Sequence, residues 1–378
     1  MPRPPRAEPL RLLVFAQSLH PRGTEKSLVR ILRHLDRGAF RPALVLAAAR
    51  GPYLRDVPDD VEVVDLGLHD RPTALAVPRL ARWIRRNDPD VALAVHTSPG
   101  RVLAAARRLS RRVPYVALEA DPFSRNEGRK RFYPLRRSLT RRALAEADAI
   151  VCVSQVVRRD LVGELRIDPS DVEMLPHACY DDDLAELAGR PAGDEWLEAP
   201  GPPVVAAVGN MYPEKDQATL VEAVARLDVP ARLVVVGEGP LRGELRELAA
   251  RRGVDLHMPG FRANPYPYLR HAGVYASSSV SEGFDISQVE AMALAKPVVV
   301  TAGDRFEAVE DGRTGLVVPP RDPAALAAAL GRLLTDRAAA RAMGERAAEA
   351  AAPLSAEAVT RRYEDLLLRV ARDDSVPA

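Results

Sequence analysis

The stretch Ser281-Glu282-Gly283-Phe284-Asp285-Ile286-Ser287-Gln288-Val289-Glu290-Ala291-Met292-Ala293 runs into the apolar segment Pro297-Val298-Val299-Val300. This order predicts a glycine turn, a helix that contains Glu290 and then a buried strand, which is typical of α/β proteins. Gly283 has no Cβ and lets backbone approach a ligand closely. The free N–H groups and positive dipole at the start of the helix favour an anion such as a diphosphate.

Glu282 and Glu290 flank this predicted anion site. Carboxylates do not bind phosphate, but they suit hydroxyl groups or a positive charge that develops on a sugar. The combination favours a nucleotide-sugar site. Two ordinary solvated glutamates are the alternative, and short motifs alone leave it open.

The length of 378 residues suits two domains of ordinary size, and 47% hydrophobic residues can supply their cores. The net charge is only +2, but it is divided unevenly. Residues 1–190 hold 33 basic and 25 acidic side chains, whereas residues 191–378 hold 21 and 27. This asymmetry supports two domains and indicates that the first half meets something anionic.

Cysteine usage indicates the compartment. Cys152 and Cys179 are the two cysteines of the sequence, which excludes a disulfide framework and predicts a reducing cytoplasm. Residues 1–6 are basic and proline-rich, without the apolar region of a signal peptide. No stretch approaches the ~20 apolar residues of a membrane span.

Strand-length apolar runs, among them Val91–Val95, Val204–Val208 and Leu316–Val318, alternate with helical patterns along the chain. The fold class that this predicts is α/β, with two doubly wound, Rossmann-like domains facing across a cleft. Ligands of such sheets bind at the carboxyl ends of the strands. A break rich in acidic residues, glycine and proline sets the expected boundaries: a first domain over 1–185, a linker over 186–202, a second domain over 203–353 and a final helical segment over 354–378.

The second domain opens with Val208-Gly209-Asn210-Met211-Tyr212-Pro213-Glu214-Lys215-Asp216. A strand ends in glycine, a loop follows, and Lys215 stands near the next helix, where its charge would add to an anion site. A surface lysine is the alternative for this motif alone. The similar turn Gly237-Glu238-Gly239-Pro240-Leu241 is interpreted as tight-turn chemistry.

Together these motifs resemble the retaining glycosyltransferases of family 4, which have the GT-B fold. The resemblance covers nearly all of residues 203–335 in order and spacing, and several motifs in register are more specific than any one of them. The matching segments are Gly209-Asn210, Lys215-Asp216, Gly237 to Leu241, Glu282-Gly283-Phe284, Glu290-Ala291-Met292, Pro297-Val298-Val299, Asp311-Gly312 and Thr314 to Pro319.

The first half resembles the family more loosely. Arg22-Gly23-Thr24-Glu25 is similar to its glycine-rich loop after the first strand, with Arg22 in place of the first glycine. Ser154 and the segment from Met174 to His177 resemble the close of the acceptor domain, and the helix around Tyr363 resembles the one that crosses back onto the first domain.

The resemblance implies a role for each matching residue. Lys215 would bind the donor diphosphate, Glu282 would face the donor sugar and Glu290 would accept hydrogen bonds from the ribose. Phe261 or Arg262 would hold the base. The expected donor residues are Gly23, Gly209, Asn210, Lys215, Arg262, Gly283, Phe284, Asp285, Ile286, Ser287 and Glu290.

The implied chemistry is front-face displacement with retention, in which Glu282, Lys215 and His96 form the expected catalytic set. Enzyme groups would mainly position reactants and stabilise charge. We expect no metal and no cofactor besides the nucleotide-sugar co-substrate, with a UDP-sugar favoured over a GDP-sugar.

Two positions depart from the family pattern. Many relatives carry a histidine near the reacting centre where this chain has Ala120, and a glycine pair where it has Gly303-Asp304. His96, which follows a predicted strand, would face the cleft or be structural. Glu119 or Asp121 would contact the acceptor instead of the missing histidine.

Residues 101–142 hold 13 basic and three acidic side chains. This run would dock on anionic lipid at the inner membrane face or hold an acidic acceptor, and a solvated helical face is the third interpretation. It lacks the interleaved aromatic residues that single-stranded nucleic acid requires, so we expect no nucleic-acid partner.

The sequence therefore predicts a cytoplasmic enzyme that transfers a sugar from a nucleotide donor to a hydroxyl acceptor. Polysaccharide, a lipid-linked sugar and a small natural product all stay open as acceptors, as does the oligomeric state. Alternatives are an NDP-sugar epimerase or a phosphorylase-like enzyme on the same fold. A catalytically weak sugar-nucleotide-binding protein is the alternative from another class.

Overall fold

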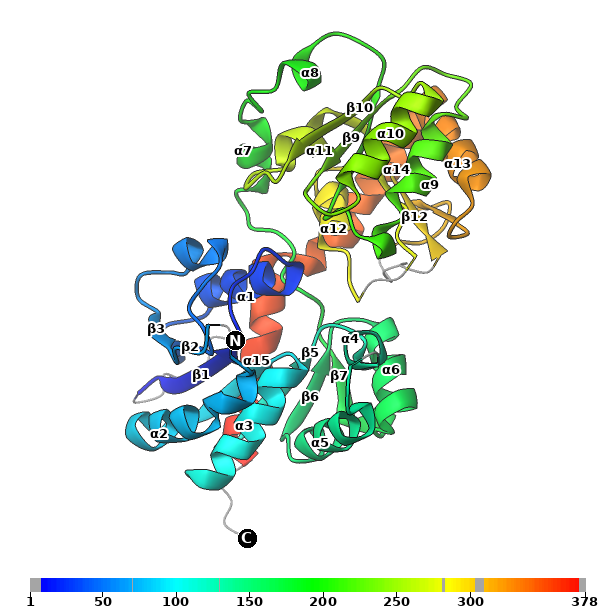
Figure 1. The fold of residues 1–378 in the computed structure, drawn as a ribbon. Helices are drawn as coiled ribbons and strands as arrows, with labels where there is room; N and C mark the ends of the chain where they lie inside the picture. The colour runs from blue at the N-terminus through cyan, green and yellow to red at the C-terminus, as the bar shows by residue number, and fades with distance from the viewer. Residues whose placement is uncertain (1–7, 70, 129, 281–282, 303–308, 374–378) are drawn as a thin grey trace. The chain divides into compact units, whose positions relative to one another are not determined.

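A computed structural model describes residues 8–69, 71–128, 130–280, 283–302 and 309–373. The chain divides into two units (Figure 1), one formed by Met1–Ala178 with Ala356–Ala378 and the other by Cys179–Ser355. Glu282 and the pair Gly303-Asp304, singled out from the sequence, lie outside the described residues.

The described residues of the first unit form a seven-stranded sheet in the order β3-β2-β1-β4-β5-β6-β7. Every pairing in it is parallel, so each connection must cross over one face of the sheet. The strands are β1 (Leu10–Ala16), β2 (Phe40–Leu46), β3 (Glu62–Asp65), β4 (Val91–Val95), β5 (Tyr115–Glu119), β6 (Ala149–Cys152) and β7 (Val172–Met174).

Helices make these crossovers, and the last helix of the chain joins them. Val359, Tyr363 and Leu367 of this last helix, α15, are buried, and it packs on α1, β4 and β5. The helices are α1 (Gly23–His34), α2 (Val77–Asn87), α3 (Thr97–Leu109), α4 (Phe123–Glu127), α5 (Tyr133–Ala145), α6 (Gln155–Leu165) and α15 (Ala356–Asp373).

The second unit repeats the architecture with a six-stranded parallel sheet in the order β10-β9-β8-β11-β12-β13. Its strands are β8 (Val204–Val208), β9 (Arg232–Val236), β10 (Leu256–Gly260), β11 (Ala272–Ser277), β12 (Val298–Thr301) and β13 (Leu316–Val318). Its helices are α7 (Leu184–Gly189), α8 (Glu195–Glu198), α9 (Gln217–Val224), α10 (Arg242–Arg252), α11 (Tyr266–His271), α12 (Ile286–Ala293), α13 (Pro323–Thr335) and α14 (Arg337–Ala351). Helix α8 and most of α7 lie in the stretch 186–202 expected as a linker, and both helices belong to this unit.

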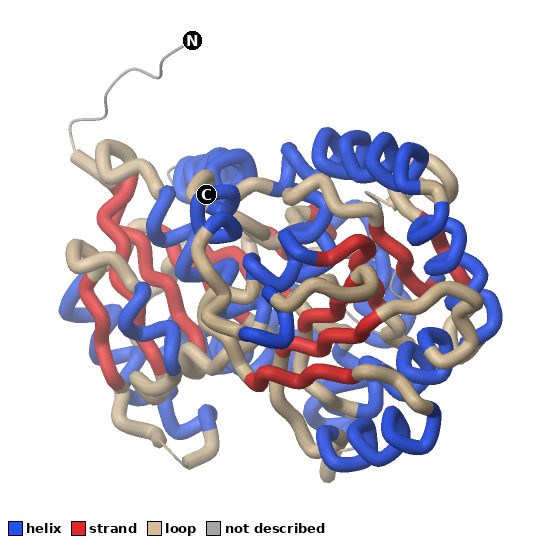
Figure 2. The backbone as a smooth tube through the Cα atoms, turned by 90° about the horizontal axis from the view of Figure 1, so that it is seen from above, coloured by secondary structure: helices blue, strands red, loops and turns tan. Residues whose placement is uncertain are grey.

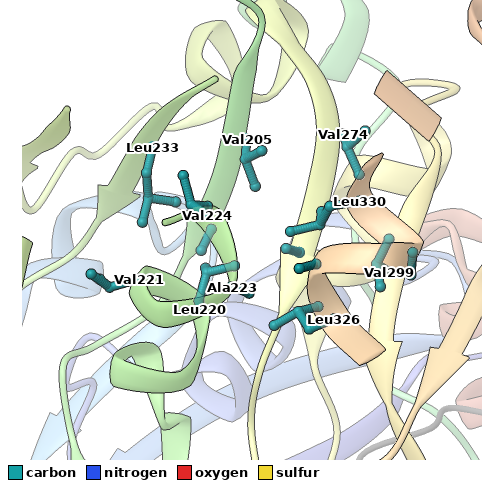
Figure 3. Packing of buried hydrophobic residues seen from close by; sticks show 14 of the residues in the cluster. Val205, Leu220, Val221, Ala223, Val224, Leu233, Val274, Val299, Leu326 and Leu330 are labelled. Atoms are coloured by element: carbon teal, nitrogen blue, oxygen red, sulfur yellow. The ribbon is translucent and has the colours of Figure 1, made fainter. Parts of the chain in front are cut away.

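Both faces of the second sheet are buried, which explains why its strands are continuous apolar runs. Val205 and Val299 pack against α9 and α13 on one face (Figure 3), while their neighbours Val204 and Val298 pack on the other. Successive strand residues point to opposite faces, so one run supplies two cores. Helices lie on both sides of the strands (Figure 2).

The strand order reverses direction once in each sheet, between β1 and β4 and between β8 and β11. The loops that leave the carboxyl ends of these neighbours diverge to opposite faces and leave a crevice, where ligands of doubly wound sheets bind. The predicted loops at Gly23 and at Gly209 follow β1 and β8, so each belongs to such a point.

Candidate functional site

The loop after β8 brings Lys215 back onto the glycine that ends the strand. A Cβ on Gly209 would lie 3.3 Å from both Cε and Nζ of Lys215, so the ammonium group lies against the Gly209 backbone. Lys215 ends a 3-10 turn (Pro213–Lys215) and is half-buried. The two residues predicted to bind a diphosphate are thus adjacent in space.

Two further glycines allow this loop to pack. A Cβ on Gly237 would lie 2.1 Å from the Gly209 carbonyl oxygen, and one on Gly239 would lie 2.4 Å from that of Met211. The Met211 N–H donates to the Glu238 carbonyl at 2.8 Å. The turn after β9, interpreted from the sequence as tight-turn chemistry, therefore supports the loop that carries Asn210 and Lys215.

The segment after β11 is tied to the same loop. The Ser278 hydroxyl donates to the Lys215 carbonyl at 2.9 Å, and the Val280 N–H donates to the Glu214 carbonyl at 2.8 Å. The chain that leads to Gly283 and α12 thus starts beside the lysine, as the strand order requires.

Asp285 caps α12. One of its oxygens accepts from the Gln288 N–H at 3.2 Å and the other from the Tyr275 hydroxyl at 3.2 Å, and the residue is buried. The side chain of Asp285 therefore serves the helix itself. Ile286 and Ser287, the first residues of the helix, have N–H groups that point out of its N-terminus.

Glu290 lies one helical turn further on and is only 1% exposed. Its Oε1 accepts a hydrogen bond from the Tyr266 hydroxyl at 3.0 Å. The carboxylate expected to meet a ribose is therefore shielded by α11 in this structure. A ligand reaches it only if Tyr266 moves or shares the contact.

Arg262, expected near the base, is held by a hydrogen-bonded chain that the sequence did not reveal. Its Nε donates to the Tyr268 hydroxyl at 3.2 Å, and that hydroxyl donates to Asp194 Oδ2 at 2.7 Å. His257 Nε2 lies 2.7 Å from the same oxygen, and the His257 ring stacks on Trp196.

These contacts also determine the ionisation of Asp194 and Tyr268. Burial opposes ionisation of Asp194, but hydrogen bonds from Tyr268 and His257 outweigh it and lower the pKa of the carboxyl. Burial and the Asp194 carboxylate together raise the pKa of Tyr268. The phenol therefore stays protonated and bridges an arginine to a carboxylate. The neighbouring Phe261 side chain is 45% exposed.

In the first unit, His96 and Glu25 meet at the point where the strand order reverses. His96 Nε2 lies 3.8 Å from Glu25 Oε1. His96 precedes α3 with φ of 76°, an uncommon value for a residue with a Cβ. Glu25 lies in the first turn of α1, just after the exposed Gly23, and its buried Oε2 has no hydrogen-bond partner among the described residues.

Glu119 ends β5 and is 2% exposed. Its Oε2 accepts a hydrogen bond from the Thr97 hydroxyl at 2.5 Å. Burial raises the pKa of Glu119 to about 7, against the opposing influence of Thr97 and Arg101. Glu119, which was expected to touch the acceptor, is therefore buried. It contacts the site through its hydrogen bond with Thr97, the residue next to His96.

Asp121, two residues further on, is half-buried, and Ala120 between them is buried. The charges of Asp121 and His96 both influence the pKa of His177, which follows β7. Burial lowers the pKa of His177 to about 3, so this imidazole is neutral near pH 7. The carboxyl edge of the first sheet thus gathers two histidines and three carboxylates (His96, His177, Glu25, Glu119 and Asp121).

The part of the chain that the structure describes contains no group of three or more His, Cys, Asp or Glu side chains able to hold a metal ion. No helix in that part has the length and apolar character that crossing a membrane requires. A metal-independent reaction stays a prediction.

Comparison with known proteins assigns the fold. HepE of Anabaena, solved in complex with UDP, superposes with a TM-score of 0.80 over 95% of this chain and 100% of its own, at 21% identity. Sucrose-phosphate synthase of Thermosynechococcus elongatus gives 0.80 over 96% and 100%, at 19% identity. The two parallel-sheet units therefore have the GT-B fold of glycosyltransferases.

Sequence comparison assigns the chain to one family of glycosyltransferases. The model for glycosyltransferase family 4 matches residues 21–181, and that for glycosyl transferases group 1 matches residues 202–336. A GDP-mannose-dependent alpha-(1-6)-phosphatidylinositol monomannoside mannosyltransferase of Mycolicibacterium smegmatis is 30% identical over 72% of this chain and 76% of its own. The chain belongs to glycosyltransferase family 4.

Other relatives match over less of their length. A D-inositol 3-phosphate glycosyltransferase of Nocardia farcinica is 34% identical over 62% of this chain and 53% of its own. One of Kineococcus radiotolerans is 34% identical over 54% and 53%. The chain spans about half the length of these two curated relatives.

Proposed function

We propose that the protein transfers a sugar from a nucleoside-diphosphate sugar to a hydroxyl group, with retention and without a metal ion. The observation that carries this proposal is the contact of the Lys215 ammonium with Gly209 at the reversal point of the second sheet. A cation held beside a glycine at this edge suits a diphosphate. Family membership supplies the reaction class.

Two regions would contact the diphosphate: the loop after β8 and the start of α12. Lys215 would neutralise phosphate charge from the β8 side. The N–H groups of Ile286 and Ser287 would donate from the start of α12, because the Asp285 cap occupies that of Gln288. Gly283 and Phe284 precede this cap and would contribute backbone, while Asn210 would add an amide where many relatives have an arginine.

The nucleoside would lie between Arg262 and Glu290. Tyr268 and Asp194 brace the guanidinium for the base, and Glu290 would accept from the ribose after exchange of its bond with Tyr266. We favour UDP over GDP. The HepE structure contains UDP and the Mycolicibacterium relative is named for GDP-mannose, so both nucleotides belong in the test.

In the transfer step the anomeric carbon–oxygen bond to the diphosphate breaks as the acceptor oxygen attacks the same face. The departing phosphate oxygen takes the acceptor proton, and Lys215 stabilises the charge that develops on it. Glu282 is proposed to face the sugar. His96, with Glu25 and the Thr97–Glu119 pair behind it, is proposed to orient the acceptor hydroxyl, with Asp121 near it. Gly23 is proposed to contribute backbone to the donor.

Acceptors named for the relatives include an inositol phosphate and a phosphatidylinositol mannoside. Polysaccharide, a lipid-linked sugar and a small natural product remain the proposed classes for this chain. Both cysteines are buried and neither forms a disulfide, which supports a reducing compartment such as the cytoplasm.

A thermal-shift screen against UDP-, GDP- and dTDP-sugars tests donor binding, and mass spectrometry of the mixtures tests turnover. We expect stabilisation by one nucleotide class and release of its diphosphate. Isomerised donor without release would indicate an epimerase. Dependence on inorganic phosphate would indicate a phosphorylase, and binding without turnover would indicate a sugar-nucleotide-binding protein. No shift with any donor would overturn the proposal.

A further inference from the structure

Helix α5 of the first unit exposes two of its three leucines. Phe132, which immediately precedes the helix, is 63% exposed, and Leu135 and Leu139 are 59% and 48% exposed. The helix buries the hydroxyl residue Thr140 instead, with Ala143 and Leu144. A helix that only packs on its own sheet would turn its leucines inward.

Leu135 and Leu139 are four positions apart in the helix, so they share one side of it. We call these two leucines and Phe132, the exposed residue directly before the helix, the apolar stripe. Single exposed leucines are ordinary, but a continuous apolar stripe marks an interaction site. Phe132 also has a left-handed backbone with φ of 63°, which is unfavourable for a residue with a Cβ.

Positive charge surrounds this stripe. Arg142 follows Leu139 by three positions and lies on the same side of the helix, and the Arg131 guanidinium lies 4.7 Å from the centre of the Phe132 ring. Among the described residues no carboxylate pairs with Arg131, Arg141 or Arg142, and all three are exposed.

Other cations of the region behave differently. Lys130 and Arg136 are both bound to Glu127, and Arg137 is paired with Glu164. Acidic side chains of the first unit therefore compensate these three cations and leave Arg131, Arg141 and Arg142 without a paired carboxylate among the described residues.

We propose that Phe132, Leu135, Leu139 and the arginines beside them form a surface that docks on an anionic lipid bilayer. Bulky apolar side chains enter the boundary between headgroups and acyl chains, while unpaired arginines remain at the level of the lipid phosphates. Charge complementarity selects this partner, because these arginines have no paired carboxylate among the described residues. The surface uses none of the donor residues, so the inference stands apart from the proposed reaction.

Co-sedimentation with vesicles tests the docking surface. The full chain is mixed with vesicles of phosphatidylcholine alone or of phosphatidylcholine with phosphatidylglycerol, at low and high salt. Leu135→Glu/Leu139→Glu removes the apolar stripe. Leu75→Glu/Leu109→Glu is the matched control, since both of those leucines are on the first unit and are 52% and 60% exposed.

We expect the wild-type chain to bind the anionic vesicles, and to bind neutral vesicles at least about tenfold more weakly. The stripe variant should lose about tenfold or more in affinity for anionic vesicles, while the control pair stays within about twofold. Salt should weaken binding. Failure of the wild-type chain to bind anionic vesicles, equal binding to both vesicle types, or an equal loss in both variants would overturn the proposal. Donor hydrolysis in solution should be the same in all three proteins, which separates this outcome from failure of the proposed reaction.

Discussion

Polar side chains of the candidate site are held by partners that lie far away in the sequence. The buried carboxylate of Glu119 accepts a hydrogen bond from Thr97, and Tyr268, which bonds the exposed Arg262, donates to Asp194. Gly209 and Lys215 were found as candidates from a short local pattern. The supporting residues carried no such pattern, because their partners become neighbours only when strands and loops assemble.

The raised pKa of Glu119 predicts a pH dependence of stability. The folded-state pKa of about 7 lies above the ordinary value of 4.5, so protonated Glu119 stabilises the fold below about pH 4.5 and that contribution is lost as pH rises through 7. In Glu119→Gln the side chain no longer titrates, so relative to wild type the variant should gain free energy of unfolding over this range, by up to roughly 3 kcal/mol. Urea unfolding at a series of pH values measures this, and a difference that does not change with pH would contradict it.

The chain from Arg262 to Asp194 predicts a selective effect on donor binding. Tyr268→Phe removes the hydroxyl that joins them, so Arg262 loses its orientation and KM for the donor should rise roughly fivefold while kcat stays unchanged. Tyr115→Phe is the matched control, because that hydroxyl donates to the Ala143 carbonyl in the first unit. It should reduce stability but leave donor KM unchanged; equal KM effects would assign Tyr268 a purely structural role.

At the scale of elements, continuous apolar runs allowed β4, β8 and β13 to be predicted with their observed bounds, because strands buried on both faces need apolar residues at every position. β10 escaped prediction, since His257, Pro259 and Gly260 break its apolar character. A solvated helical face was one interpretation of residues 101–142. The structure has the helix Tyr133–Ala145 in that region, with Leu135 and Leu139 exposed and Leu144 buried.

The packing of three glycines in the turns after β8 and β9 predicts that Gly237 cannot accept a side chain. Its φ of 152° and the closeness of the Gly209 carbonyl mean that Gly237→Ala displaces the loop that carries Lys215. We expect a loss of about 2 kcal/mol or more in stability, with weaker donor binding. Gly243→Ala is the control: it lies in α10 with open space around it, and should stabilise by up to ~1 kcal/mol. Similar unfolding curves for the two variants would contradict this account.

At the scale of the whole molecule, the last helix of the chain, α15, is part of the first unit. Residues of α15 come after the entire second unit in sequence, yet they pack on β4 and β5. The final helical segment was expected from its amphipathic pattern, and its partners were implied by the family resemblance.

This arrangement predicts where a mutation near the C-terminus acts. Leu367 is 1% exposed, so Leu367→Ala should destabilise the first unit by about 2–5 kcal/mol. Hydrogen exchange should show faster exchange in peptides of residues 8–178, with little change in those of residues 179–355. Faster exchange confined to the second unit would contradict the assignment of α15.

The central claim, that the chain transfers sugar from a nucleotide donor held by Lys215, is tested most directly by one comparison. Wild type and Lys215→Met are incubated with the donor that stabilises the wild-type chain, and released nucleotide and glycosylated product are measured by mass spectrometry. Methionine keeps the apolar stem over Gly209 and removes the charge, so kcat/KM should fall roughly 100-fold. Equal turnover in both proteins, or no consumption of nucleotide sugar by wild type, would contradict the account.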